Sequence, residues 1–176
     1  MPADRSADSY AIYSLLMPGQ PFAQLPADQN AHWAIAGVTV NTDDRNPAVP
    51  PDGQLKPPPD HEKEFREALL DYQANQYVRI ELTQKEFRIG HDFSLLSPDE
   101  VASFREAKTG SQAQSQFDGY PGITFFSGVY FDAHHDAALV YMNDWCAHLC
   151  ASGTWVYLEK HGGKWVRNSG IVVPGA

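Results

Sequence analysis

The chain has 176 residues, a formal net charge of −9 at pH 7 and a pI of about 5.1. This acidic balance argues against nucleic-acid binding, which needs a basic surface that displaces counterions, and against attraction to anionic lipid. Hydrophobic residues make up 43% of the chain and charged residues 20%. This composition is typical of a globular protein, so we expect a single domain over residues 1–176.

No apolar run is long enough to insert into a membrane as a helix. The first ten residues, MPADRSADSY, also lack the apolar centre of a signal peptide. Two locations therefore stay open. The protein is periplasmic or secreted and has lost its signal peptide, or it is cytoplasmic.

The first half of the chain predicts a helix, a strand and an irregular loop. SADSYAIYSLLM (6–17) has apolar residues at helical spacing, with Ser6 or Asp8 as a candidate N-cap. Pro18 and Gly19 end this helix, and AHWAIAGVTV (31–40) has the β-branched residues of a strand. The segment at about 41–60 is rich in proline, which lacks an N–H and restricts φ, so we expect an irregular loop.

Two further helices and one strand are predicted next. Residues 60–76 form a helix with Asp60 as its cap and Phe65, Leu69 and Tyr72 on one face. Residues 77–87, YVRIELTQKEF, alternate as a strand does. Residues 95–108 form a helix, in which Ser97, Pro98 and Glu100 carry the pattern of a capping box.

The last third of the chain predicts an antiparallel meander of about four strands. The expected strands are GITFFSGVYF (122–131), AALVYMNDW (137–145), GTWVYLEK (153–160) and KWVRNSGIVV (164–173). Alternation places Val156 and Leu158 on one face and Trp155 and Tyr157 on the other, so both faces need cover. The expected fold class is α+β, with N-terminal helices packed on this C-terminal sheet.

The same region resembles a group of small, often exported bacterial proteins of unknown function. The matching positions include Tyr120-Pro121-Gly122, Ser127, Phe131, Ala138-Leu139-Val140-Tyr141, Gly153, Leu158-Glu159-Lys160 and Gly163-Lys164-Trp165. The closing hairpin is also similar to the last hairpin of cystatin-like and NTF2-like domains. The resemblance implies a fold type and export from the cytoplasm, and it implies no activity.

Both cysteines lie in WCAHLCASGTW, four residues apart. Cys-x-x-Cys redox spacing is absent, and a zinc site would need further ligands from distant turns. A turn can bring Cα atoms at this spacing to about 6 Å, which suits a disulfide. We therefore expect a Cys146–Cys150 disulfide that stiffens the loop, with two free thiols as the alternative.

A second group of polar residues lies in the turn before the 137–145 strand and in the turn after the 153–160 strand. Imidazole and carboxylate groups are ligands for zinc and other transition metals. The possible metal ligands are Asp132, His134, His135, Asp136 and His161. The alternative interpretation is a solvated polar turn, in which case the protein needs no cofactor.

Four aromatic residues of the meander are candidates to face a ligand: Trp145, Trp155, Tyr157 and Trp165. Core packing is the competing explanation for each of them. The function we expect is that of a bacterial envelope protein that binds a small molecule or a protein partner without catalysis. The alternative is a metal-dependent or general acid–base hydrolase that uses the 132–136 turn.

Overall fold

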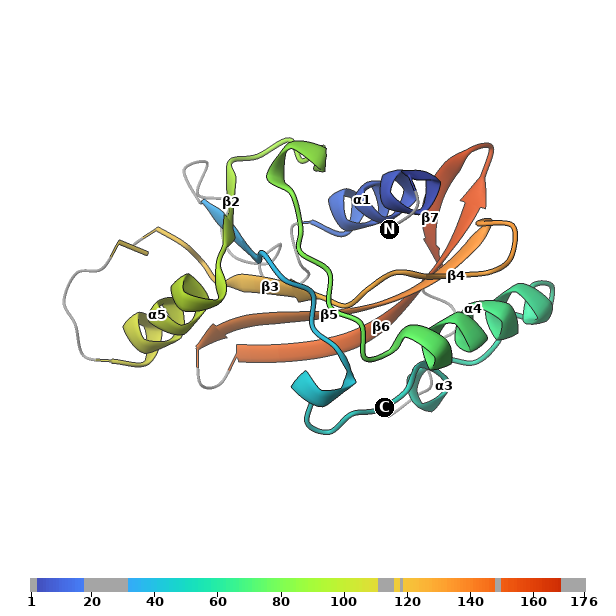
Figure 1. Ribbon diagram of the computed structural model, residues 1–176, viewed down its shortest axis with the longest axis horizontal. Coiled ribbons are helices and arrows are strands. Elements are labelled where there is room, and N and C mark those ends of the chain that lie inside the picture. The colour runs from blue at the N-terminus through green and yellow to red at the C-terminus, as the bar shows by residue number, and fades with distance from the viewer. Residues whose placement is uncertain (1–2, 18–31, 111–115, 118, 148–149, 169–176) are drawn as a thin grey trace.

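The computed structural model describes residues 3–17, 32–110, 116–117, 119–147 and 150–168. Their strands form one seven-stranded mixed sheet, so the α+β class is confirmed (Figure 1). Six strands follow the order β2-β1-β3-β5-β6-β7, and β4 pairs with β5. The strands are β1 (Trp33–Ala36), β2 (Phe93–Leu96), β3 (Ile123–Phe126), β4 (Tyr130–Phe131), β5 (Ala137–Ala147), β6 (Cys150–His161) and β7 (Lys164–Asn168).

The C-terminal part of the sheet is antiparallel, as the alternating sequence predicts. Strand β5 pairs with β6 from Ala137 opposite Glu159 to Ala147 opposite Cys150, and β6 pairs with β7 through a turn at Gly162 and Gly163. Both glycines have positive φ, which residues with a side chain rarely adopt. Beyond residue 168, the fourth predicted strand lies outside the described residues.

The first strand of the predicted meander is interrupted. It divides into β3 and β4, because regular pairing with β5 stops at Ser127 and residues 128–129 lie outside any strand. The hydroxyl of Ser127 accepts a hydrogen bond from the Tyr141 backbone N–H at 2.9 Å and donates one to the Gly128 carbonyl at 2.7 Å. A side chain thus takes the place of a backbone partner, which local alternation cannot reveal.

The N-terminal edge of the sheet corrects the expectation of an all-antiparallel meander. Strand β1 runs parallel to both β2 and β3. The strand predicted over 77–87 is wrong, because that segment forms one isolated bridge, from Val38 to Glu81, and the short 3-10 helix η2 (Gln84–Glu86). The edge strand β2 was not predicted, since only four residues form it and its partner is distant in the chain.

Helix α1 (Ala3–Leu16) covers one face of the sheet. The predicted apolar positions Tyr10, Tyr13, Leu16 and Met17 are buried there, beside Val156 and Leu158 of β6. The proposed caps Ser6 and Asp8 are wrong, because the helix begins at Ala3 and both residues lie inside it.

Helices α4 (Glu62–Asn75) and α5 (Pro98–Thr109) cover the opposite face (Figure 1). From α4, Phe65 and Tyr72 pack against Trp155 and Tyr157, so the predicted division of β6 between two faces is confirmed. Asp60 does not cap α4, whose N-cap is His61 without a side-chain bond. The capping box of Ser97 and Glu100 is present at α5 as predicted.

The proline-rich segment 41–60 contains the 3-10 helix η1 (Thr42–Asp44) and the single-turn helix α3 (Pro51–Gln54), and is otherwise irregular. It is held to the sheet by Trp155. The indole N–H donates to the Val49 carbonyl at 2.8 Å, and the Trp155 backbone N–H donates to Gln54 at 3.0 Å. This docking brings residues 44–46 above the face that α4 and α5 share.

Candidate functional site: an arginine-lined pocket

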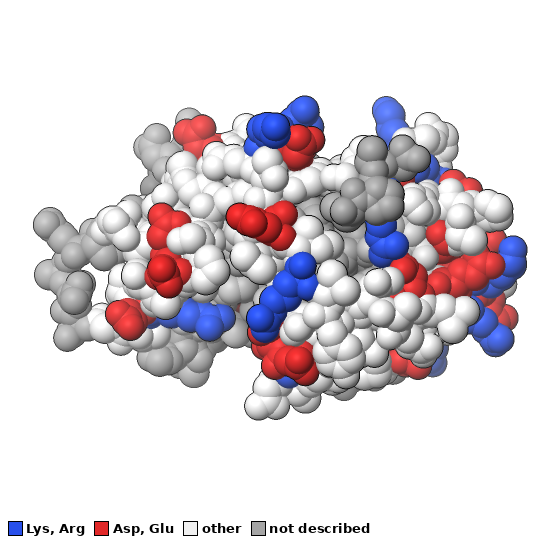
Figure 2. All heavy atoms as spheres, in the orientation of Figure 1, with Lys and Arg blue, Asp and Glu red and all other residues white. Residues whose placement is uncertain are grey.

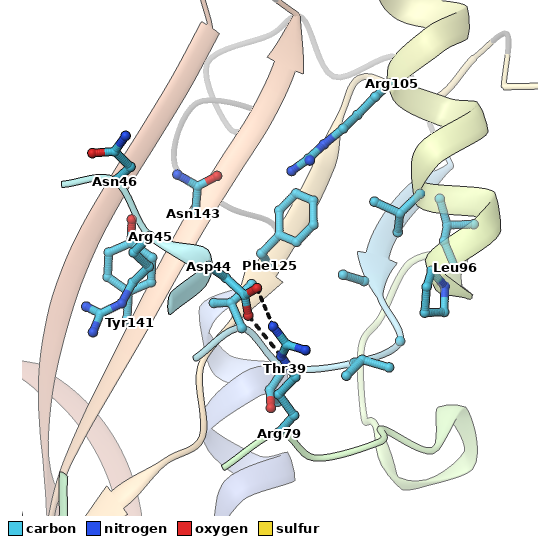
Figure 3. A pocket seen from close by; sticks show the side chains of 16 residues that line it. Thr39, Asp44, Arg45, Asn46, Arg79, Leu96, Arg105, Phe125, Tyr141 and Asn143 are labelled. Atoms are coloured by element: carbon cyan, nitrogen blue, oxygen red, sulfur yellow. Dashed lines mark hydrogen bonds and ion pairs between the residues drawn. The ribbon is translucent and has the colours of Figure 1, made fainter. Parts of the chain in front are cut away.

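A cavity of about 560 Å³ lies on this face of the sheet, where β1, β3 and β5 meet α5 and the 37–46 segment (Figure 3). Its size falls in the range of small-molecule sites in proteins. Its lining residues are Ala36, Gly37, Val38, Thr39, Val40, Asp44, Arg45, Asn46, Arg79, Leu96, Pro98, Val101, Arg105, Phe125, Tyr141 and Asn143.

Backbone hydrogen bonds hold the 37–40 segment that forms one wall. The Gly37 N–H donates to the Leu96 carbonyl at 2.7 Å, and the Val40 N–H donates to the Phe126 carbonyl at 2.8 Å. A Cβ atom on Gly37 would lie 2.9 Å from the Leu96 carbonyl oxygen. Glycine is therefore required by the close approach of two backbones, and this approach closes the wall of the cavity.

A capping box at Asn41 places the charged residues that follow it. The Asn41 side chain accepts from the N–H groups of Asp43 and Asp44 at 3.0 and 3.3 Å, and Asp44 accepts from the Asn41 N–H at 2.9 Å. The Asn41 amide also donates to the Tyr77 carbonyl at 3.1 Å. One short turn thus fixes Asp44 and Arg45 relative to the segment that carries Arg79.

Asp44 neutralises one arginine of the pocket. Its carboxylate accepts two hydrogen bonds from Arg79, at 3.1 Å from Nε and 2.6 Å from Nη2 (Figure 3). This bidentate geometry suits guanidinium and carboxylate groups. Arg79 also lines a second cavity of about 360 Å³, together with Arg5, whose guanidinium is paired with Asp71. Both arginines of that smaller cavity therefore already have acidic partners.

Arg45 is buried without a carboxylate partner in the described part of the chain. Its guanidinium donates to the Val49 carbonyl at 3.1 Å, to the Thr42 hydroxyl at 2.9 Å and to the Tyr72 hydroxyl at 3.1 Å. It also lies 5.0 Å from the ring centres of both Tyr141 and Trp155. Neutral acceptors and aromatic faces make burial of the cation tolerable, and they leave its charge uncompensated.

Arg105 is the exposed cation at the mouth of the pocket. It extends from α5 over Phe125 towards Asn143 (Figure 3), with its guanidinium 5.0 Å from the Phe125 ring centre and 5.8 Å from that of Trp145. Within the described ranges, no hydrogen bond or ion pair engages the guanidinium of Arg105 or the amides of Asn46 and Asn143. As far as the described residues go, the mouth thus presents one cation and two amides without protein partners.

The charge of the pocket is opposite to that of the chain. Three arginines and one aspartate are among its lining residues, whereas the whole chain carries −9. Figure 2 shows acidic and basic side chains mixed over α4, with smaller groups of either sign elsewhere on this face. A local positive excess in a cavity concentrates small anions, because the low-dielectric walls focus the field.

The structure places the predicted cysteine loop at the turn between β5 and β6. The β5–β6 register shifts between Trp145 and Ala147, and Ala147 lies opposite Cys150. Cys146 is not a free thiol, while the side chain of Cys150 lies outside the described residues. The Cys146–Cys150 disulfide therefore stays a prediction.

As the meander implied, the 132–136 turn and His161 lie at the other end of these strands.

The five candidate metal ligands do not converge. The Asp132 carboxylate is engaged by backbone N–H groups of its own turn, at 3.2 Å from His134, 2.8 Å from Asp136 and 2.7 Å from Ala137. His135 stacks on Phe131, and His161 contacts Glu159. Across the described residues, no group of three or more His, Cys, Asp or Glu is arranged to hold a metal ion. Asp132 here stabilises a turn, and among the described residues this turn forms no metal site for a metal-dependent hydrolase.

Three of the four candidate ligand-facing aromatics belong to the core. Trp155, Tyr157 and Trp165 are 1%, 0% and 8% exposed, so a ligand cannot contact them from solvent. Trp145 is partly exposed beside Arg105. The aromatic side chains that line the pocket are instead Phe125 and Tyr141.

Sequence reasoning missed the arginines of the pocket. Arg45, Arg79 and Arg105 come from a turn, an extended segment and a helix that are far apart in the chain. No local spacing links them, and each alone is indistinguishable from a solvated surface arginine. The one local signal was the NTDDR sequence (41–45), whose Asn and Asp form the capping box before Arg45.

No described helix has both the length and the apolar character needed to cross a membrane. Comparison of the chain with protein-family models, curated proteins and solved structures gives no match.

Proposed function

We propose that this protein is a non-enzymatic domain that binds a small anionic molecule in the arginine-lined pocket. One observation carries the proposal. Two guanidinium groups of the pocket, those of Arg45 and Arg105, have no carboxylate partner among the described residues. A bound anion would supply the missing negative charge beside these two guanidinium groups.

The charged side chains of the pocket are also positioned before any ligand binds. Arg45 and Asp44 are positioned by the Asn41 turn, and Arg105 is supported by the rings of Phe125 and Trp145. A cation held in place before binding loses little conformational entropy when the ligand arrives. The proposal places the protein in the bacterial cell envelope, as its resemblance to exported proteins implies.

The test is a titration of the ¹⁵N-labelled protein with benzoate and with benzyl alcohol, followed by amide chemical shifts. Benzoate is expected to shift residues around Arg105 and Asn143 with saturation, and the neutral alcohol to bind at least about tenfold more weakly. Arg105→Gln should weaken benzoate binding. Arg66→Gln is the matched control, because it removes the same charge from an exposed position on α4.

Equal binding of the acid and the alcohol would refute the proposal, since the site would then not select for charge. So would an Arg105→Gln variant that binds benzoate as well as the unsubstituted protein does. Loss of benzoate binding in the Arg66→Gln control would show that the effect comes from overall charge and would also count against the pocket.

A further inference from the structure

The pocket has two chemically different sides. Apolar side chains come from the 36–40 segment, from the end of β2 and from α5: Ala36, Val38, Val40, Leu96, Pro98 and Val101. Asn46, Asn143 and Tyr141 lie across from Leu96 in Figure 3. Arg105 reaches from the apolar side towards Asn143, so its cation lies at the mouth beside the Phe125 ring.

From this arrangement we infer the class of ligand: an amphipathic monocarboxylate with one anionic head and an apolar body. The inference rests on the proposed anion site. The carboxylate binds at the mouth, where it accepts from Arg105 and from the amide of Asn143. The body extends along Val38, Val40 and Val101, where it is removed from water.

The charge inventory favours one carboxylate over a phosphate dianion. Arg79 is occupied by Asp44, and Arg45 lies under Tyr141 with three neutral acceptors. Among the described residues that line the mouth, only Arg105 has an unoccupied guanidinium, and its planar pair of N–H groups matches the two oxygens of a carboxylate. The Asp44 carboxylate would repel the second charge of a dianion.

The volume of the cavity favours a ligand that has an apolar part in addition to its anionic group. A space of about 560 Å³ is many times larger than acetate requires. Apolar surface on one side gains binding energy only if the ligand covers it, and each methylene removed from water contributes to that gain. A small inorganic anion would leave the apolar side of the pocket exposed to water.

The experiment compares four probes by isothermal titration calorimetry on the full chain: 4-phenylbutyrate, 4-phenylbutan-1-ol, acetate and inorganic phosphate. Phenylbutyrate is expected to bind at least about tenfold tighter than each of the others. Val101→Thr keeps the side-chain shape and adds a hydroxyl, so it should weaken phenylbutyrate several-fold. Val166→Thr is the matched control on β7, because Val166 is exposed and outside the pocket.

The outcomes separate this inference from the proposed function. If acetate or phosphate binds as tightly as phenylbutyrate, the amphipathic class is refuted while the anion site stands. If the alcohol binds as tightly as the acid, the anion site itself fails. If none of the four binds at millimolar concentration, both fail. Val101→Thr with unchanged phenylbutyrate affinity would refute the placement of the apolar body.

Discussion

The side chain of Tyr141 lies directly over Gly153 on the neighbouring strand. A Cβ atom added to Gly153 would come within 1.9 Å of the Tyr141 hydroxyl oxygen and 2.8 Å of its Cζ atom. The absent side chain lets the ring lie close to the sheet, where its centre is 5.0 Å from the Arg45 guanidinium. A glycine on β6 thus helps to hold the buried cation of the pocket.

Gly153→Ala should therefore displace Tyr141 and destabilise the protein by roughly 1–3 kcal/mol, the usual cost of overpacking. Urea unfolding measures the change. Gly90→Ala is the matched control, because a Cβ there meets no atom within 4 Å. The double variant Gly153→Ala/Tyr141→Leu should recover part of the stability lost in Gly153→Ala, because the smaller leucine relieves the clash. If the effects of the two substitutions were strictly additive, the contact between Tyr141 and Gly153 would be contradicted.

The buried carboxyl group of Asp144 should make the stability of the folded protein depend on pH. Asp144 is 3% exposed, and burial raises the pKa of its carboxyl to about 6, although a hydrogen bond from the Thr124 hydroxyl at 2.6 Å acts against this rise. The folded state then binds the proton more tightly than the unfolded state. The contribution of Asp144 to the free energy of unfolding is therefore fully present below about pH 4 and is lost as the pH rises through about 6.

Asp144→Asn removes this ionisation and keeps an oxygen that can accept from Thr124. We expect the variant to be more stable than the unsubstituted protein at pH 7, by an amount on the order of 2 kcal/mol, with the difference shrinking towards pH 4. Thermal unfolding at several pH values measures it. Asp52→Asn, an exposed control, should leave the profile unchanged. A constant difference at all pH values would contradict the prediction.

The capping box at Ser97 stabilises the start of α5, the helix that carries Arg105. The Ser97 hydroxyl accepts from the Glu100 N–H at 3.3 Å, and Glu100 accepts from the Ser97 N–H at 2.8 Å, which lowers the pKa of the Glu100 carboxyl. Ser97→Ala should cost about 1 kcal/mol in the free energy of unfolding. Ser103→Ala on the same helix should be neutral or slightly stabilising, because alanine favours helix interiors. Equal losses in the two variants would argue against the cap.

Asp71 joins three elements of the fold. Its carboxylate pairs with Arg5 of α1, accepts from the Phe131 N–H of β4 at 2.9 Å and accepts from the Asn75 amide of α4 at 2.7 Å. Asp71→Asn should cost roughly 1.5–3 kcal/mol in chemical unfolding, since a charged acceptor of several bonds is lost.

The control for Asp71 is Glu62→Gln, which breaks the exposed pair with Arg66 on the same helix. Its effect should stay below about 0.5 kcal/mol, because solvent screens exposed ion pairs. A similar cost for both variants would mean that the Asp71 network contributes no more than a surface pair.

The predicted disulfide has a direct test in the intact mass of the denatured, unreduced protein. A Cys146–Cys150 bond lowers the mass by about 2 Da relative to the reduced chain, and digestion between the two residues should leave the peptides joined. This result would favour an oxidising compartment. A full reduced mass with two alkylatable thiols would exclude the bond and remove one argument for export.

The sequence by itself determined the elements whose signals are local. The capping box at Ser97, the buried face of α4 and the pairing of β5, β6 and β7 all follow from short spacings between neighbouring residues. The alternation of Val156 and Leu158 against Trp155 and Tyr157 likewise followed from the two-residue period of a strand.

Only the tertiary structure decided the parallel edge of the sheet and the pocket. Strand β1 finds its partners at β2 and β3, far along the chain, and the 77–87 segment stays largely unpaired despite its alternating sequence. Arg45, Arg79 and Arg105 share one cavity because three separate segments dock on the same face. Contacts at long sequence separation leave no local spacing, so the site becomes visible only when the chain is folded.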